Sequence, residues 1–224
     1  VGASGYNYIS TNNGSSWSTG GRLSSTTFQD GHNGRAYYYI QSLYGVAFGN
    51  STFVAVGDVG KILRSTDNGA NWSHLTTGYA SNSGNNYKAS LNGINNLRGV
   101  SFGNNTFVAV GYSGKIITST DDGSSWDNET AVNSNNLYGV TFGNSTFVAV
   151  GSNGTIVKST NNGASWSSSS SGTSETLFGV TFGNNTFMAV GNSGTIVKST
   201  DNGANWSSSS SGTTNNLYGV AFGD

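Results

Sequence analysis

A repeat of about forty residues constrains the fold of this chain more than any other feature of its sequence. Residues 137–176 read LYGVTFGNSTFVAVGSNGTIVKSTNNGASWSSSSSGTSET, and residues 177–216 follow the same pattern almost letter for letter. Weaker copies begin at Leu43 and Leu97. Repetition at this period indicates an array of one supersecondary unit, in which each unit buries its apolar face against its neighbours.

The residue pattern within one unit predicts strands rather than helices. Tyr138, Val140 and Phe142 fall on one face of an extended segment and the residues between them on the other, which is a period of two. Further strands are expected at 147–150 and 156–159, separated by turns rich in Asn, Ser and Gly, and a fourth, more polar strand begins at Trp166. Four short antiparallel strands in about forty residues form the meander of a β-propeller blade.

Two independent counts predict five blades. The opening strand and the tryptophan after the third turn each occur five times. The opening strands begin at Leu43, Leu97, Leu137, Leu177 and Leu217, and the tryptophans are Trp17, Trp72, Trp126, Trp166 and Trp206. We therefore expect an all-β chain that forms one domain over residues 1–224, a five-bladed β-propeller of four-stranded antiparallel blades.

The closing blade is expected to combine the two terminal segments of the chain. Residues 1–17 align without a gap with 190–206, and residues 217–224 match the opening of the unit. Joining first and last segments in one blade removes free sheet edges. The counterpart of the second strand is missing from this blade, so a neighbouring chain fills it, the natural chain is longer, or the ring tolerates the gap.

Two insertions, 18–42 and 73–96, interrupt the repeat. Both join a fourth strand to the next first strand, and such crossings lie on the same face of a propeller as the turns between second and third strands. Loops on a rigid scaffold are where binding usually resides. The candidate ligand-binding residues lie in these insertions and turns: Arg35, Tyr38, Asp58, Tyr79, Tyr87, Tyr112, Asn153 and Asn192. The tyrosines at 37–39 either stack on sugar rings or pack an added strand onto the scaffold.

Composition excludes several classes of partner. The net charge is -1 and only 8% of residues are charged, where roughly 25% is usual, so neither a nucleic-acid face nor a polybasic membrane patch is expected. The absence of Cys excludes disulfides and thiolate metal sites. No apolar run approaches the roughly 20 residues of a membrane helix. A surface rich in Ser, Thr, Asn and Gly and a start at Val1 favour a trimmed protein, secreted or at the cell surface.

Five segments carry the resemblance to a known family. Residues 65–72 and 199–206 read STDNGANW, 119–126 read STDDGSSW, 159–166 read STNNGASW and 10–17 read STNNGSSW. These resemble the Asp-box, the S-x-D-x-G-x-x-W motif of bacterial sialidase (BNR-type) repeats, which also occurs in sortilin-type receptors and photosystem II assembly factors. The resemblance implies a β-propeller with the box between the third and fourth strands.

The box has a structural explanation. An Asp or Asn can accept hydrogen bonds from backbone N–H groups of its own turn, Gly allows positive φ, and Trp buries a large ring between sheets. Replacement of Asp by Asn in two boxes argues against a calcium site, which would need carboxylates and further ligands. The expected structural residues are Asn12, Trp17, Asp67, Trp72, Asp121, Trp126, Asn161, Trp166, Asp201 and Trp206.

We expect no catalytic residues, metal or cofactor. Sialidases use three Arg, a Tyr nucleophile paired with Glu, and an Asp acid/base, whereas Arg64 and Arg98 occupy ordinary repeat positions here. The Arg-Ile-Pro segment that opens many sialidases cannot exist without Pro. His32 and His74 lie in separate insertions without ligand spacing and are interpreted as surface residues.

Three functions follow, in order of preference. The first is a non-catalytic extracellular propeller that binds a glycan, lectin-like, through its insertions or through pockets repeated between blades. Near-identical blades would present repeated weak sites on one disc. The alternative is a structural subunit of a surface layer or filament, completed by strand addition from a neighbour. A sialidase-like glycoside hydrolase comes third.

Overall fold

The computed structural model describes residues 6–9, 15–16, 18–22, 26–29, 36–39, 42–75, 96–129 and 132–223, and for the strands before residue 40 it describes the backbone. Within these residues the regular structure is all β except for single-turn 3-10 helices. The prediction of an all-β propeller built from four-stranded antiparallel blades is therefore confirmed, and four complete blades lie within the described residues.

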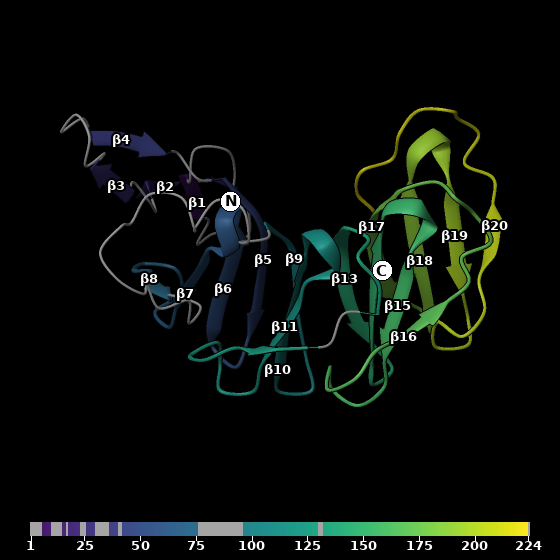
Figure 1. Cartoon of the computed structure of the whole chain (residues 1–224), viewed down its shortest axis with the longest axis horizontal. Coiled ribbons are helices and arrows are strands. Elements are labelled where there is room, and N and C mark those ends of the chain that lie inside the picture. Colours follow the sequence, from purple (N-terminus) through teal and green to yellow (C-terminus); the bar gives the residue numbers. More distant parts are fainter. Residues whose placement is uncertain are drawn as a thin grey trace.

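The four blades follow one another along the chain, from blue to yellow in Figure 1. Each is a meander in which consecutive strands pair. The first blade contains β5 (Leu43–Gly49), β6 (Thr52–Gly57), β7 (Ile62–Ser65) and β8 (Ser73–Leu75). The second contains β9 (Leu97–Gly103), β10 (Thr106–Gly111), β11 (Ile116–Ser119) and β12 (Asp127–Asn128). The third contains β13 (Leu137–Gly143), β14 (Thr146–Gly151), β15 (Ile156–Ser159) and β16 (Ser167–Ser169). The fourth contains β17 (Leu177–Gly183), β18 (Thr186–Gly191), β19 (Ile196–Ser199) and β20 (Ser207–Ser209).

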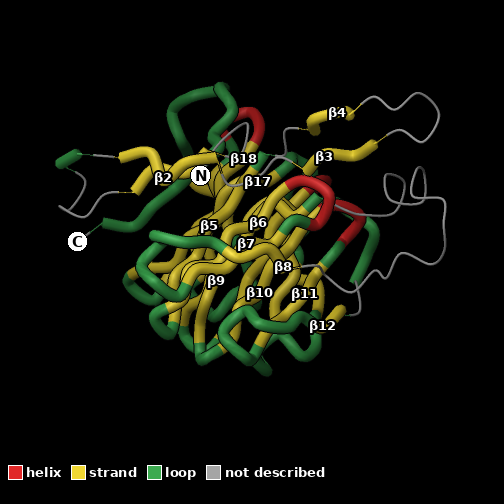
Figure 2. Tube along the Cα trace, turned by 90° about the vertical axis from the view of Figure 1, so that its left-hand side faces the viewer, coloured by secondary structure: helices red, strands yellow, loops and turns green. Residues whose placement is uncertain are grey.

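Residues that tolerate positive φ make the turns of each blade. Asn144 and Ser145, with φ of 45° and 57°, join the first two strands of the third blade in the left-handed conformation that matches strand twist. A 3-10 helix joins the second and third strands, and its middle residue, Asn153, has a φ of 55°. In the four described blades these helices are η2 (Asp58–Gly60), η3 (Tyr112–Gly114), η4 (Ser152–Gly154) and η5 (Asn192–Gly194). They lie at one end of the blades, red in Figure 2.

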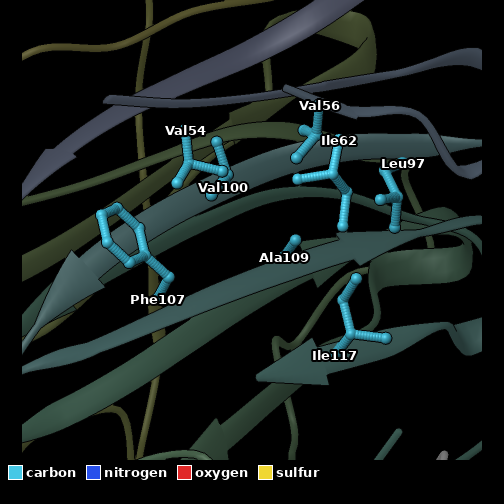
Figure 3. Packing of buried hydrophobic residues seen from close by; sticks show 8 residues of the cluster. All are labelled: Val54, Val56, Ile62, Leu97, Val100, Phe107, Ala109 and Ile117. Carbon is cyan, nitrogen blue, oxygen red and sulfur yellow. The ribbon is translucent and has the colours of Figure 1, made fainter. Parts of the chain in front are cut away.

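The three largest core clusters lie between blades rather than within one. Figure 3 shows Val54, Val56 and Ile62 of the first blade facing Phe107 and Ala109 of the second, and all five are fully buried. The same cluster recurs between the second and third blades and between the third and fourth. The second strands of the middle two blades, β10 and β14, are buried along their whole length, and this burial stabilises each blade through its neighbour.

The turn between third and fourth strands is closed by its own side chains. In the second blade, the Asp121 carboxylate accepts hydrogen bonds from the Ser119 hydroxyl at 2.8 Å and from the Ser125 amide at 2.9 Å. The Gly123 amide donates to the Ser119 hydroxyl at 2.9 Å, and the half-buried Trp126 indole donates to the Gly123 carbonyl at 3.2 Å. Similar bonds recur in the other three described boxes, around Asp67, Asn161 and Asp201.

Parts of the predicted fifth blade are present. Residues 217–223 lie against β17, because Tyr218 and Phe222 approach Gly179 and Gly183. The chain before the first blade forms two hairpins, β1 (Tyr6–Ile9) with β2 (Ser18–Arg22) and β3 (Thr26–Gln29) with β4 (Ala36–Tyr39). The pairing of Tyr8 with Thr19 and Ile9 with Ser18 has the register of a third and a fourth strand, as in β19 and β20.

These parts do not share one sheet. The β1–β2 hairpin is a separate two-stranded sheet, and residues 217–223 belong to no sheet. The composite closing blade, and with it the count of five, stays a prediction. The 18–42 insertion places residues 36–39 in an added strand, but the structure does not describe the tyrosine side chains there.

Candidate functional site

The turns between second and third strands and the crossings between blades lie on one face of the molecule. Asn135, in the crossing that leads to the third blade, donates from its side-chain amide to the Thr155 hydroxyl at 2.7 Å. The Ser193 amide in η5 likewise donates to the Asn216 side chain at 3.1 Å. Amide and hydroxyl groups thus hold together the loops of this face, called here the crossing face.

Two depressions occupy equivalent positions on the crossing face. Each lies between a 3-10 turn and the serine-rich segment that follows the fourth strand. The depression in the third blade, of about 520 Å³, is lined by Asn133, Asn153–Ile156 and Ser168–Ser174. The depression in the fourth blade, of about 660 Å³, is lined by Gly194 and Ser209–Asn215.

Close backbone contacts fix the shape of the first depression. Gly154, at a φ of 64°, lies so close to the Thr173 carbonyl that a Cβ atom would overlap it. The buried Ser171 hydroxyl donates to that same carbonyl at 3.0 Å. Gly194, Ser211 and Thr213 repeat this arrangement in the fourth blade. In the third blade, these contacts hold the serine-rich segment on its buried side, while Ser168 and Ser170 stay exposed to solvent.

The chemistry of both depressions is that of uncharged hydrogen bonding. Their linings contain Ser, Thr, Asn, Gly and one Ile, and no ionisable side chain. Hydroxyl groups both donate and accept, and amide side chains do the same with separate atoms. Such a surface can exchange hydrogen bonds with a neutral polyhydroxylated ligand. It offers no acid, base or charged nucleophile.

A row of aromatic rings runs between blades along the first strands. Tyr138 and Phe178 have ring centroids 5.5 Å apart, and Phe178 and Tyr218 have centroids 5.1 Å apart. Arg98 takes the aromatic position of the repeat in β9, and its guanidinium carbon lies 3.9 Å from the centroid of the Tyr44 ring. This row joins the crossing face because the Ser152 hydroxyl, in η4, donates to the Tyr138 hydroxyl at 3.2 Å.

The predicted ligand-binding residues have different positions. Asn153 lines the first depression, while Asn192 lies in η5 outside the lining of the second. Tyr112 lies in η3, its ring centroid 4.5 Å from the Arg98 guanidinium carbon. Asp58 is engaged within its blade, accepting from the Ser42 amide at 2.9 Å and from the Tyr44 hydroxyl at 2.8 Å.

The remaining predicted residues cannot be placed with their side chains. Tyr38 lies in β4, of which only the backbone is described. Arg35, Tyr79 and Tyr87, together with the box residues Asn12 and Trp17, lie outside the described residues. Sequence reasoning missed the segment Ser168–Ser174, although the duplicated run SSSSSGT at 167–173 and 207–213 marked it.

Three carboxylates with lowered pKa values lie in the boxes, outside the linings of the depressions. Hydrogen bonds from Asn71 and Ser65 lower the pKa of Asp67 to about 2, and bonds from Asn205 and Ser199 do the same for Asp201. Bonds led by the Ser125 amide lower the pKa of Asp121 to about 2. Over the described ranges no three His, Asp or Glu side chains gather where a metal ion could be held, and no helix is long and apolar enough to cross a membrane.

Comparisons with known proteins identify the fold. No protein-family profile and no curated protein sequence matches the chain. Among solved structures, YCF48 from Cyanidioschyzon merolae is 17% identical with a TM-score of 0.58, over 81% of this chain and 60% of that chain. A sialidase from Trypanosoma rangeli, solved with 2,3-difluorosialic acid, is 12% identical with a TM-score of 0.54, over 84% and 40%. A GH74 enzyme from Niastella koreensis is 20% identical with a TM-score of 0.50, over 90% and 29%.

These similarities establish a propeller fold and no more. Identities of 12% to 20% leave function open, and one propeller scaffold serves unrelated activities. This chain spans less than two thirds of the length of each of the three chains.

Proposed function

We propose that this protein is a non-catalytic carbohydrate-binding propeller, lectin-like, that acts outside the cell as a secreted or surface-bound module. The observation that carries the proposal is the pair of equivalent, uncharged depressions on the crossing face. Their linings consist almost entirely of hydroxyl, amide and backbone groups. A neutral glycan, whose surface is mostly hydroxyl, is the ligand class that this lining matches.

Repetition supplies affinity that a single shallow site lacks. The two depressions belong to adjacent blades of one rigid array, so a ligand with several similar sugar units can engage both. The second contact is then intramolecular, and avidity can exceed either single affinity by roughly 10² to 10⁴. We therefore expect the protein to prefer polymeric or clustered glycans over single sugars.

A binding role fits the linings better than hydrolysis does. Glycoside hydrolysis ordinarily needs two carboxyl groups across the scissile bond, and the depressions contain none. Because the propellers of known structure that resemble this chain include enzymes, hydrolase activity of this protein should be tested directly. Incubation with a sialoside and with a neutral oligosaccharide should release no product, whereas turnover would contradict the proposal.

Titration with neutral oligosaccharides tests binding itself. We expect millimolar affinity for short ligands with two sites per chain, measured by chemical-shift changes. Ser170→Leu and Ser210→Leu lie at equivalent exposed positions of the two depressions, so each should remove one site and the double variant both. Ser124→Leu, at an exposed box turn, is the matched control and should leave both sites. Absence of binding by any glycan class at millimolar concentration would rule the function out.

The structural alternative is favoured by one separate observation. Residues 217–223 lie against β17 without a hydrogen-bonded strand beside them among the described residues. A neighbouring chain could supply that strand, as in strand addition. This alternative predicts assemblies without any ligand.

A further inference from the structure

Neighbouring blades contact each other through a glycine–phenylalanine contact that repeats along their first strands. In four successive pairs of these segments, a phenylalanine of the later segment packs on a glycine of the earlier one. A Cβ atom added to that glycine would overlap the ring in every case. The pairs are Gly49 with Phe102, Gly103 with Phe142, Gly143 with Phe182, and Gly183 with Phe222.

A second glycine lets the same strands approach along their backbones. A Cβ on Gly99 would lie 3.1 Å from the Tyr138 carbonyl oxygen, and one on Gly139 would lie 2.9 Å from that of Phe178. Each first strand thus has a glycine face that receives the next blade and an aromatic face that enters the preceding one. The described chain contains this interface four times.

A glycine face and an aromatic face of this kind each also occur without a described segment packed on them. Around Gly219 and Gly223 no atom of the described residues lies within 4 Å of an added Cβ. On β5, the aromatic face is open: Tyr44 is 40% exposed, Val46 46% and Phe48 54%.

The exposed large hydrophobic residues of the first blade all lie on β5. Ala55 and Leu63, farther out on the first blade, are fully buried, and with Leu43 they form a cluster against Trp72. We infer that the β5 face lacks a single extended segment with two glycines four residues apart, as the internal interfaces have. Residues 217–223 are the described segment whose glycine face is uncovered.

The two segments also have the same sequence. Residues 43–49 and 217–223 both read LYGVAFG. Each strand can therefore adopt the geometry that the internal interfaces already use, without any new kind of contact. Neither segment carries a charged residue of its own, and the charged groups next to the β5 face, Asp58 and Arg98, already contact Tyr44.

We propose that this protein self-associates head to tail, with the glycine face of residues 217–223 of one copy packing on Tyr44, Val46 and Phe48 of a second copy. Phe48 enters the space over Gly223, as Phe222 enters the space over Gly183. The contact joins two different surfaces, so it is heterologous, and repeated copies form a ring or an open row. This association is independent of glycan binding, because it uses the first strands and leaves the two depressions free.

The proposed contact buries little surface, so its detection needs a method that traps weak complexes. One strand against another buries much less than the roughly 1,200 Å² at the low end of stable interfaces. We expect weak, concentration-dependent association that covalent trapping reveals better than chromatography. The chain has no cysteine, so every introduced thiol is the sole one in its chain.

The experiment mixes two single-cysteine variants, Phe48→Cys and Gly223→Cys, under mild oxidation. A mixed disulfide dimer should form at least tenfold faster than in the control mixture of Phe48→Cys with Ser170→Cys, which places the second thiol at an exposed position of the crossing face. Adding Val46→Asp to the Phe48→Cys chain should abolish the excess. The double variant Gly183→Cys with Phe222→Cys provides the intrachain reference for this contact.

Two results would overturn the proposal. Equal trapping rates for the test and control mixtures would show that the faces do not meet. An intrachain disulfide in the double variant Phe48→Cys with Gly223→Cys at high dilution would show that the β5 face is covered by the chain's own strand instead of a second copy. Neither result bears on glycan titration, so failure of this proposal is distinguishable from failure of the proposed function.

Discussion

Asp121 shows at residue scale why Asp and Asn are interchangeable in the box turn. One side-chain oxygen accepts from the Ser119 hydroxyl and from the Ser125 amide, and an Asn oxygen can do both. Asn161 does so in the third blade, while its side-chain amide donates to the Ser165 hydroxyl at 2.9 Å. In the second blade the direction of that last bond is reversed, because the Ser125 hydroxyl donates to the Asp121 carboxylate.

Acid should therefore destabilise the protein through its three box aspartates. Their pKa values are lowered from 3.8 to about 2 in the folded chain, so the stability they contribute is complete above pH 4 and is lost as pH falls toward 2. Asp121→Asn should make the urea midpoint less dependent on pH in that window while changing it little at pH 7. An unchanged pH profile in this variant would contradict the assignment.

Gly154 offers a second test at residue scale. Gly154→Ala places a methyl group on the Thr173 carbonyl at a φ of 64°, whereas Gly172→Ala, at a φ of 74°, meets no atom within 4 Å. Left-handed backbone alone costs Ala roughly 1–2 kcal/mol. We expect Gly172→Ala to lower the free energy of unfolding by about that amount and Gly154→Ala to lower it further. Equal losses in chemical denaturation would mean that the loop moves aside.

At element scale the first strand makes the closest contacts between neighbouring blades. Its bulge, where the register shifts between Leu137 and Gly139, leaves Tyr138 without a paired residue on β14. Alternation in the sequence predicted which face each side chain takes. It could not predict the bulge, because a one-residue register shift depends on the partner strand and on close approach of the next backbone.

Gly139 and Gly219 form a matched pair for testing the close contact between neighbouring backbones. They hold the same repeat position, but a Cβ lies 2.9 Å from the Phe178 carbonyl at Gly139 and meets nothing at Gly219. Gly139→Ala should lower the free energy of unfolding by about 1–3 kcal/mol, as overpacking does. Gly219→Ala should change it by less than about 0.5 kcal/mol. Thermal melts of both variants, compared at low protein concentration, measure the difference.

The elements that sequence reasoning did not foresee are those with the least distinctive residues. Four strands per blade, the Asn-rich turns and the box were readable because each depends on a local requirement for φ, alternation or a side-chain acceptor. The serine segments that line the depressions were not. Their shape comes from contacts such as Ser171 with the Thr173 carbonyl and Gly154 with that same group, which a run of serines does not reveal.

At the scale of the whole molecule, the seven-residue sequence LYGVAFG occurs twice, so its two copies can be compared in two different structural settings. In residues 43–49 it is β5, paired along its length with β6. In residues 217–223 it pairs with no strand of the described chain, and Leu217 alone donates a backbone hydrogen bond, to the Gly191 carbonyl at 2.9 Å. Intrinsic exchange rates of the amide hydrogens are set by local sequence and so are nearly equal in the two copies.

Amide hydrogen exchange should therefore separate the two copies. The β5 amides that face β6 should exchange at least about 100-fold more slowly than their counterparts in 218–223, because they are paired with β6 whereas the amides of 218–223 pair with no described strand. Equal protection at low protein concentration would show that residues 217–223 already lie within a sheet. Raising the concentration then distinguishes two kinds of assembly. Strand addition pairs the backbone edge and must slow exchange in 218–223, whereas packing of its glycine face on β5 covers side chains, leaves that edge open and keeps exchange fast.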